Sequence, residues 1–161
     1  RLAMSGAEIA GRSLDVEVAG HSVVRLPVPD EIMVPGEPAS EFMIVELDGL
    51  RGFWFYGKDA WLSMPAPTVD VDVERIDDAM RVHLRCASMI RDLYLDVSRL
   101  SASGRASDNL LTMLPGDERV VDLQGCEEES PEALRQRLLD PGVIMTANAC
   151  GAGNRPPDPI P

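Results

Sequence analysis

The stretch "VDVDVERIDDAMRVHLRC", residues 69–86, decides the fold class of this chain. In Val69–Glu74 every second residue is valine and the residues between are acidic, and Met80–Cys86 alternates in the same way. Strict alternation places apolar side chains on one face of a strand and polar side chains on the other. The sequence therefore predicts two half-buried antiparallel strands, joined by a tight turn at Asp77-Asp78.

Downstream of this pair, Asp92–Val97 and Glu118–Leu123 are predicted strands. Between them, "SDNLLTMLPGDERVVDL" carries a turn, in which Pro115 presets φ at the second position and Gly116 accepts a positive φ at the third. Asp108 is expected to bond backbone N–H groups and set the preceding bend. The apolar residues of this stretch are expected to fill the end of the sandwich: Leu110, Leu111, Met113 and Leu114. Because each piece has a structural role, none is needed for catalysis.

Upstream, the sequence predicts two strands, Leu14–Val18 and His21–Pro29, and then a hairpin within Glu41–Asp59. Asp48-Gly49 is a strong two-residue hairpin signal, and Phe42–Leu47 is apolar enough for a buried strand.

The prolines of Leu62–Val69 interrupt any sheet and mark a domain boundary. Ser130 and Pro131 form the start signal of a helix over Ala133–Leu139, whereas Cys150–Pro161 has too little apolar surface to order itself. We therefore predict an all-β, antiparallel sandwich architecture with a short C-terminal helix and a disordered tail. The predicted divisions are 1–64, 65–125 and 126–161.

The composition restricts the partners. The chain has 161 residues, a formal net charge of −12 and a pI near 4.5, so we expect neither nucleic acid nor an anionic membrane to bind it. Its N-terminus lacks an apolar signal segment and an initiator Met, from which we expect a piece of a longer protein. The three cysteines, Cys86, Cys126 and Cys150, are odd in number, which favours reduced structural thiols over a disulfide scaffold or zinc site. Together with the lack of glycosylation sequons, such thiols favour a cytoplasmic location.

The candidate catalytic groups are explained more simply as solvent-exposed surface residues. Asp70, Asp72 and Glu74 share one strand face, whereas a glycosidase needs two carboxylates that converge on a cleft. His21 and His83 have neither a nucleophile elbow nor a metal motif nearby, so we predict no catalytic residue, no metal and no cofactor.

Aromatic residues gather in "GFWFYGKDAW", residues 52–61. Trp54, Tyr56 and Trp61 are the candidate contact residues, either as a sugar-stacking platform or as part of a core and domain interface. The core-and-interface interpretation is favoured.

The order of motifs resembles the C-terminal immunoglobulin-like domains of β-mannosidases of the glycoside hydrolase family 2 type. The resemblance covers residues 14–125 and rests on these stretches: Trp54–Asp59, Pro65–Pro67, Leu84–Leu93 and Ser107–Asp117. The family's aromatic-Asp pair before its Leu-Pro-Gly turn is replaced by Leu111-Thr112. In that family the catalytic glutamates lie in an upstream (β/α)₈ barrel, so the resemblance assigns no catalytic residue to this chain.

The resemblance implies a non-catalytic region of a glycosidase that releases terminal non-reducing β-D-mannose. Its partners would be the upstream barrel of the same polypeptide and, for the whole enzyme, an oligosaccharide substrate. Residues 1–64 would hold the later strands of an incomplete immunoglobulin-like domain, whose uncovered edges and faces favour a homo-oligomer. The alternative is a free-standing carbohydrate-binding or adhesion sandwich, and an independent enzyme that uses its surface acids ranks last.

Overall fold

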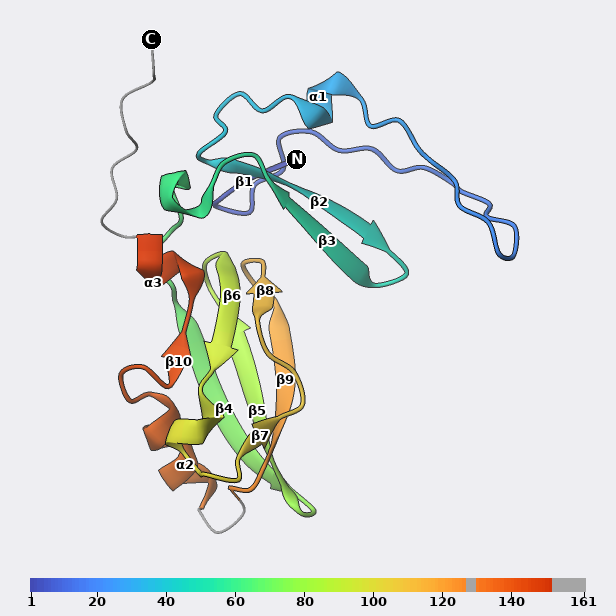
Figure 1. The fold of residues 1–161 in the computed structure, drawn as a ribbon. Helices are drawn as coiled ribbons and strands as arrows, with labels where there is room; N and C mark the ends of the chain where they lie inside the picture. The colour runs from blue at the N-terminus through green and yellow to red at the C-terminus, as the bar shows by residue number, and fades with distance from the viewer. Residues whose placement is uncertain (127–129, 152–161) are drawn as a thin grey trace. The chain divides into compact units, whose positions relative to one another are not determined.

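The computed structural model describes residues 1–126 and 130–151, and it divides the chain into two compact units, Arg1–Ser63 and Met64–Pro161 (Figure 1). Of the predicted tail, residues 152–161 lie outside the described part of the chain. Each unit is described separately below.

The second unit contains a four-stranded antiparallel sheet in the order β4-β5-β9-β7. Its strands are β4 (Val69–Ile76), β5 (Ala79–Cys86), β9 (Glu118–Gln124) and β7 (Arg105–Ala106). The turn between β4 and β5 is tight because Asp77 adopts a positive φ of 49°. Asp and Asn tolerate this conformation better than most residues, which explains why the Asp77-Asp78 pair marks the turn.

A second sheet has the order β10-β6-β8, with β6 (Ile90–Leu95), β8 (Leu111–Met113) and β10 (Ile144–Met145). The two sheets form the layers of a sandwich around one apolar core, as Figure 1 shows for β6 and β8 over β5 and β9. The most enclosed core side chains alternate along the strands, and they include Met80, Val82, Leu84, Leu93, Leu95, Met113, Val121 and Leu123. The predicted antiparallel β-sandwich is therefore confirmed.

The C-terminal segment completes this unit. Helix α2 (Pro131–Leu138) begins where predicted, because the Ser130 Oγ accepts a hydrogen bond of 3.2 Å from the Ala133 N–H. Leu134 and Leu138 of α2 are fully buried against the core. A single turn, η2 (Val97–Arg99), follows β6, and helix α3 (Ala147–Gly151) follows β10.

The predicted turn after β8 is present: Gly116 has φ 87°, and the Leu114 carbonyl accepts the Asp117 N–H at 2.9 Å. The expectation that Leu110 fills the end of the sandwich is wrong. Its φ is 57° and its side chain is 63% exposed, because the chain turns there before β8 begins. Leu111 and Met113 are buried as predicted.

An asparagine side chain continues the β6–β8 pairing just before β8 begins. The Leu95 N–H donates to Asn109 Oδ1 at 2.7 Å, and Asn109 Nδ2 donates back to the Leu95 carbonyl at 3.1 Å. The amide therefore satisfies both backbone groups of Leu95, as a neighbouring strand would.

Side chains also form hydrogen bonds with backbone groups of β4, which is an edge strand of its sheet. Arg135 Nε from α2 donates to the Val71 carbonyl at 2.8 Å. Asp72 Oδ1 accepts the Val73 N–H at 2.9 Å. These bonds tie α2 to β4 and satisfy backbone groups that no strand pairs.

The first unit contains a smaller antiparallel sheet of order β1-β2-β3, with β1 (Leu2–Ala3), β2 (Glu41–Leu47) and β3 (Leu50–Phe55). The predicted hairpin is confirmed: Asp48 and Gly49 both have positive φ, 49° and 78°, as a two-residue turn of this kind requires. The expectation that Phe42–Leu47 is a buried strand is wrong beyond its start. The single turns are α1 (Asp30–Met33) and η1 (Asp59–Trp61).

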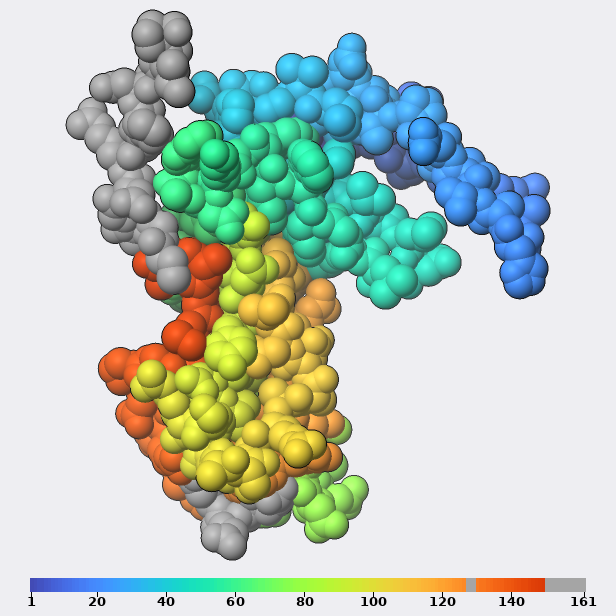
Figure 2. Space-filling model, viewed as in Figure 1, coloured from blue at the N-terminus to red at the C-terminus, as the bar shows by residue number. Residues whose placement is uncertain are grey.

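The predicted strands Leu14–Val18 and His21–Pro29 are wrong, because neither segment pairs with another strand. Residues 11–28 instead extend as a narrow projection of the first unit, drawn in blue in Figure 2. A turn closes its tip, where the Ser22 N–H donates to the Ala19 carbonyl at 3.2 Å. The two prolines of the second segment remove ladder donors, so alternation alone did not suffice for a sheet.

Candidate functional site

The aromatic residues of the first unit divide between the two faces of the β2–β3 hairpin. Phe42 lies 5.6 Å from Phe55 and 6.3 Å from Phe53, measured between ring centroids, and these rings share one face. Trp54 lies on the opposite face and is 60% exposed. The phenylalanines therefore form the small core of this unit, and Trp54 is available to a partner.

Tyr56 and Trp61 have local partners. The Tyr56 hydroxyl donates to the Ile32 carbonyl, and burial raises the pKa of Tyr56. The Lys58 Nζ lies 4.9 Å from the centroid of the Trp61 ring, a cation–π distance. Of the candidate sugar or interface residues, Trp54 is thus the most exposed, and the assignment of a partner to them remains a prediction.

One buried carboxylate organises the start of the first unit. Glu41 is 7% exposed and receives a 2.7 Å ion pair from Arg1 Nη1. Its oxygens also accept the N–H groups of Gly36 and Glu37, at 3.3 and 3.0 Å. Because these partners engage both carboxylate oxygens, Glu41 holds the N-terminus and the Gly36–Glu37 segment against β2.

The outer face of the β4-β5-β9 sheet is charged, and ion pairs link side chains of its neighbouring strands. Asp70, Asp72 and Glu74 of β4 are exposed, as the alternation predicts. Arg81 forms a two-point contact with Asp122, at 2.8 and 3.3 Å. The resulting hydrogen bond lowers the pKa of Asp122. Paired surface charges of this kind are typical of a solvated sheet face.

His83 lies between two carboxylates on that face. Its Nε2 is 3.0 Å from Glu74 Oε1 and its Nδ1 is 3.1 Å from Glu118 Oε1. The hydrogen bonds to Glu74 and then Glu118 raise the pKa of His83. Arg85 Nη2 donates to Glu118 Oε1 at 3.2 Å, and the hydrogen bonds from Arg85 and then His83 lower the pKa of Glu118. The group joins three strands, β4, β5 and β9.

This arrangement predicts a pH-dependent contribution to stability. Because the folded-state pKa of His83 is raised, its ion pairs contribute fully below the unfolded value of about 6.5, and the contribution is lost as pH rises through the folded value. In thermal unfolding from about pH 5.5 to about pH 8.5, we expect the stability difference between wild type and His83→Gln to shrink as pH rises. Leu139→Ala, which removes no titratable group, should show a constant offset over the same range. A His83→Gln difference that grows with pH would contradict the assignment.

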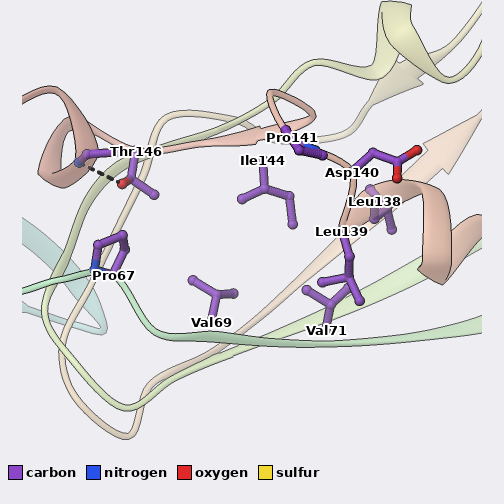
Figure 3. Close-up of a pocket in the computed structure, with 10 residues that line it drawn as sticks. Pro67, Val69, Val71, Leu138, Leu139, Asp140, Pro141, Ile144 and Thr146 are labelled. Carbon is purple, nitrogen blue, oxygen red and sulfur yellow. Dashed lines mark hydrogen bonds between the residues drawn. The ribbon is translucent and has the colours of Figure 1, made fainter.

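A cavity of about 260 Å³ opens between β4 and the C-terminal segment of the second unit (Figure 3). Figure 3 shows Val69 and Val71 of β4 facing Leu139 and Ile144 across it. The remaining lining residues are Pro67, Leu138, Asp140, Pro141, Thr146 and Ala149. Only one of the lining residues is a carboxylate, whereas a retaining glycosidase needs two carboxyl groups about 5–5.5 Å apart. This cavity therefore lacks the groups for glycoside cleavage.

Asn148 of α3 closes the end of the second sheet and received no role from the sequence. Its side chain is buried, and its Oδ1 accepts the Arg91 N–H at 2.8 Å. Its Nδ2 donates to the carbonyls of Met89 and Pro65, at 2.8 and 3.0 Å. One amide thus joins α3 to two other backbone segments, Met89–Arg91 and the segment at Pro65. No periodic pattern marks such a residue, so sequence reasoning could not find it.

The cysteines offer no nucleophile in the described part of the chain. Cys86 and Cys126 are both buried, and they form no disulfide with each other. Burial, with the charge of Asp117, raises the pKa of Cys86, which keeps it a weakly reactive thiol. Among residues 1–126 and 130–151, no group of metal-binding side chains converges, and no helix is long and apolar enough to span a bilayer.

Comparison with known families identifies the second unit. Residues 64–139 match the mannosidase immunoglobulin-fold domain family, a range that begins one residue after the first unit ends and includes β4 through α2. No curated protein sequence matches the chain. The motifs on the second unit that carry the resemblance, Leu84–Leu93 and Ser107–Asp117, lie inside the matched range and form β5, β6, β8 and the turn before β9. Residues 64–139 of this chain are therefore an immunoglobulin-fold domain similar to the one found in β-mannosidases.

Proposed function

We propose that this chain is the non-catalytic C-terminal region of a β-mannosidase-like glycosidase. The full-length enzyme would hydrolyse terminal non-reducing β-D-mannose residues with two carboxylates of an upstream barrel. The observation that carries the proposal is the match of residues 64–139 to the mannosidase immunoglobulin-fold family. In this role the second unit is a rigid module that supports the barrel of the same polypeptide.

The chemistry of the second unit supports a structural role. Two of its sheet-face carboxylates are already engaged, Asp122 by Arg81 and Glu118 by Arg85 and His83. The cavity beside β4 is lined mostly by apolar side chains and a single carboxylate. A glycosidase instead keeps one carboxyl group protonated and a second ionised on opposite sides of a bond.

An assay with an aryl β-mannoside tests the proposal. We expect the purified chain to release no more aryl alcohol than a heat-denatured sample, whereas a polypeptide that includes the upstream barrel should turn the substrate over. Turnover by the chain alone that disappears in Asp140→Asn would contradict the non-catalytic role, because Asp140 is the one carboxylate that lines the cavity.

The exposed Trp54 favours one second candidate, a sugar-binding sandwich. Titration calorimetry with manno-oligosaccharides separates the two. The support role predicts no measurable heat, and the binding role predicts heat that is lost in Trp54→Ala.

A further inference from the structure

The β2–β3 hairpin has one face on which every side chain is apolar. Cross-strand pairing places Met43 opposite Trp54, Val45 opposite Gly52, and Leu47 opposite Leu50. Because side chains alternate along a strand, these pairs lie on the face opposite to the phenylalanines. We call it the open face, and it consists of Met43, Val45, Leu47, Leu50, Gly52 and Trp54.

The open face is exposed over most of its area. The exposed fractions are 56% for Val45, 67% for Leu47, 77% for Leu50 and 60% for Trp54. Scattered apolar residues are normal on a protein surface, but a contiguous patch that contains a tryptophan marks an interaction site. The patch also lies on regular strands, so its shape is fixed before any partner binds.

The charges of the hairpin favour a second copy of the chain as the partner. Glu46 and Arg51 lie on the other face, where they form an ion pair of 3.2 Å. None of the residues of the open face is charged, and all of them lie in residues 1–63, which the structure describes without a gap. Since the chain has a net charge of −12, two copies repel each other over most of their surfaces. A charge-free face is where they approach with the smallest electrostatic cost.

The open face also contains a knob beside a hole. Gly52 carries no side chain, and a Cβ atom added to it would meet no other atom within 4 Å, so the face is open and low at this position between Leu50 and Trp54; this low position is the hole. Trp54, two residues further along β3, projects from the same face. A surface that carries both features is self-complementary under a two-fold rotation, which seats each knob in the other copy's hole.

We propose that the open face is a homodimer interface, in which Trp54 of each copy packs over Gly52 of the other. The contact is isologous and closes at the dimer, so larger assemblies do not form through it. Because the patch is smaller than a standard interface, the dimer dissociates at about micromolar concentration.

Sedimentation velocity over about 1–200 µM chain tests the proposal, since this range brackets a micromolar dissociation constant. The mass should rise from 17.5 kDa to twice that value. Trp54→Ala should raise the dissociation constant at least about 30-fold, as expected for a central tryptophan. Trp61→Ala, which changes the chain's other tryptophan outside the open face, should dimerise like wild type. A wild-type chain that stays monomeric over the range, or grows beyond a dimer, overturns the proposal.

Gly52→Val tests the docking geometry. The substitution suits a strand and has open space for its side chain, so the hairpin should fold as before, which far-UV circular dichroism verifies. Because the valine fills the hole that receives Trp54, we expect dimerisation to weaken at least tenfold despite the added apolar surface. A Gly52→Val chain that dimerises as tightly as wild type overturns the knob-in-hole contact.

Discussion

Replacing Leu138 by alanine is expected to lower the free energy of unfolding of the second unit by about 2–5 kcal/mol. Leu138 is fully buried on α2, and it belongs to the same core as the strand residues of both sheets. Truncation removes the transfer free energy of the lost methyl groups and enlarges the cavity beside β4 that Leu138 lines. Urea denaturation followed by far-UV circular dichroism measures the loss.

The next residue provides a matched control. Leu139 is 50% exposed, so Leu139→Ala removes the same atoms from a site that is already partly in water. We expect this variant to change the unfolding free energy by no more than about 1 kcal/mol. Equal losses for the two variants would show that α2 is not part of the cooperative core.

Replacing Asn148 by alanine is expected to destabilise the second unit by about 3–5 kcal/mol. The change leaves the Arg91 N–H and the carbonyls of Met89 and Pro65 without the partner that the amide provides. Each buried polar group that loses its partner costs about 1–3 kcal/mol. The loss is measurable by urea denaturation, and hydrogen exchange at the Arg91 amide should accelerate with it.

Gln136→Ala is the control for this second variant. Gln136 is exposed on α2, and its Nε2 donates to Glu132 Oε1 at 2.9 Å. Since water replaces this bond when the amide is removed, we expect a loss of no more than about 0.5 kcal/mol. If Asn148→Ala were as mild as Gln136→Ala, the amide would be replaceable by solvent and the segment around α3 would open readily.

Asn148 also bears on the extent of the domain. The family match ends at residue 139, yet β10 pairs with β6 beyond it, with Ile144 opposite Leu95. Asn148 then fastens α3 to the start of β6. The stable module in this chain therefore extends about ten residues past the matched range.

The sandwich could be predicted because its strands obey a local rule. Val69–Glu74 and Met80–Cys86 alternate without exception, and the aspartate pair between them tolerates the tight turn. The same rule failed for Leu14–Val18, which alternates equally well but pairs with no strand. Periodicity reports which face of a strand would be buried, not whether a partner exists to bury it.

The contacts that complete the fold were not predictable for a different reason. Asn109 and Asn148 act through backbone groups far away in sequence, Leu95 for the first and Met89 for the second. A single amide carries no period, and asparagine is common in loops, where it usually bonds to its own neighbours. Similarly, the open face could be recognised only after the cross-strand register had placed Met43, Val45 and Leu47 opposite the residues of β3.

The side-chain bonds on β4 have a consequence for how this protein resists aggregation. An outer strand whose backbone groups are unsatisfied can template the addition of further chains, which is how amyloid-like fibrils grow. On β4, Arg135 donates a hydrogen bond to the Val71 carbonyl and Asp72 accepts one from the Val73 N–H. An incoming strand would have to displace both side chains. These two bonds make the Val71–Val73 part of this edge a poorer template for an added strand.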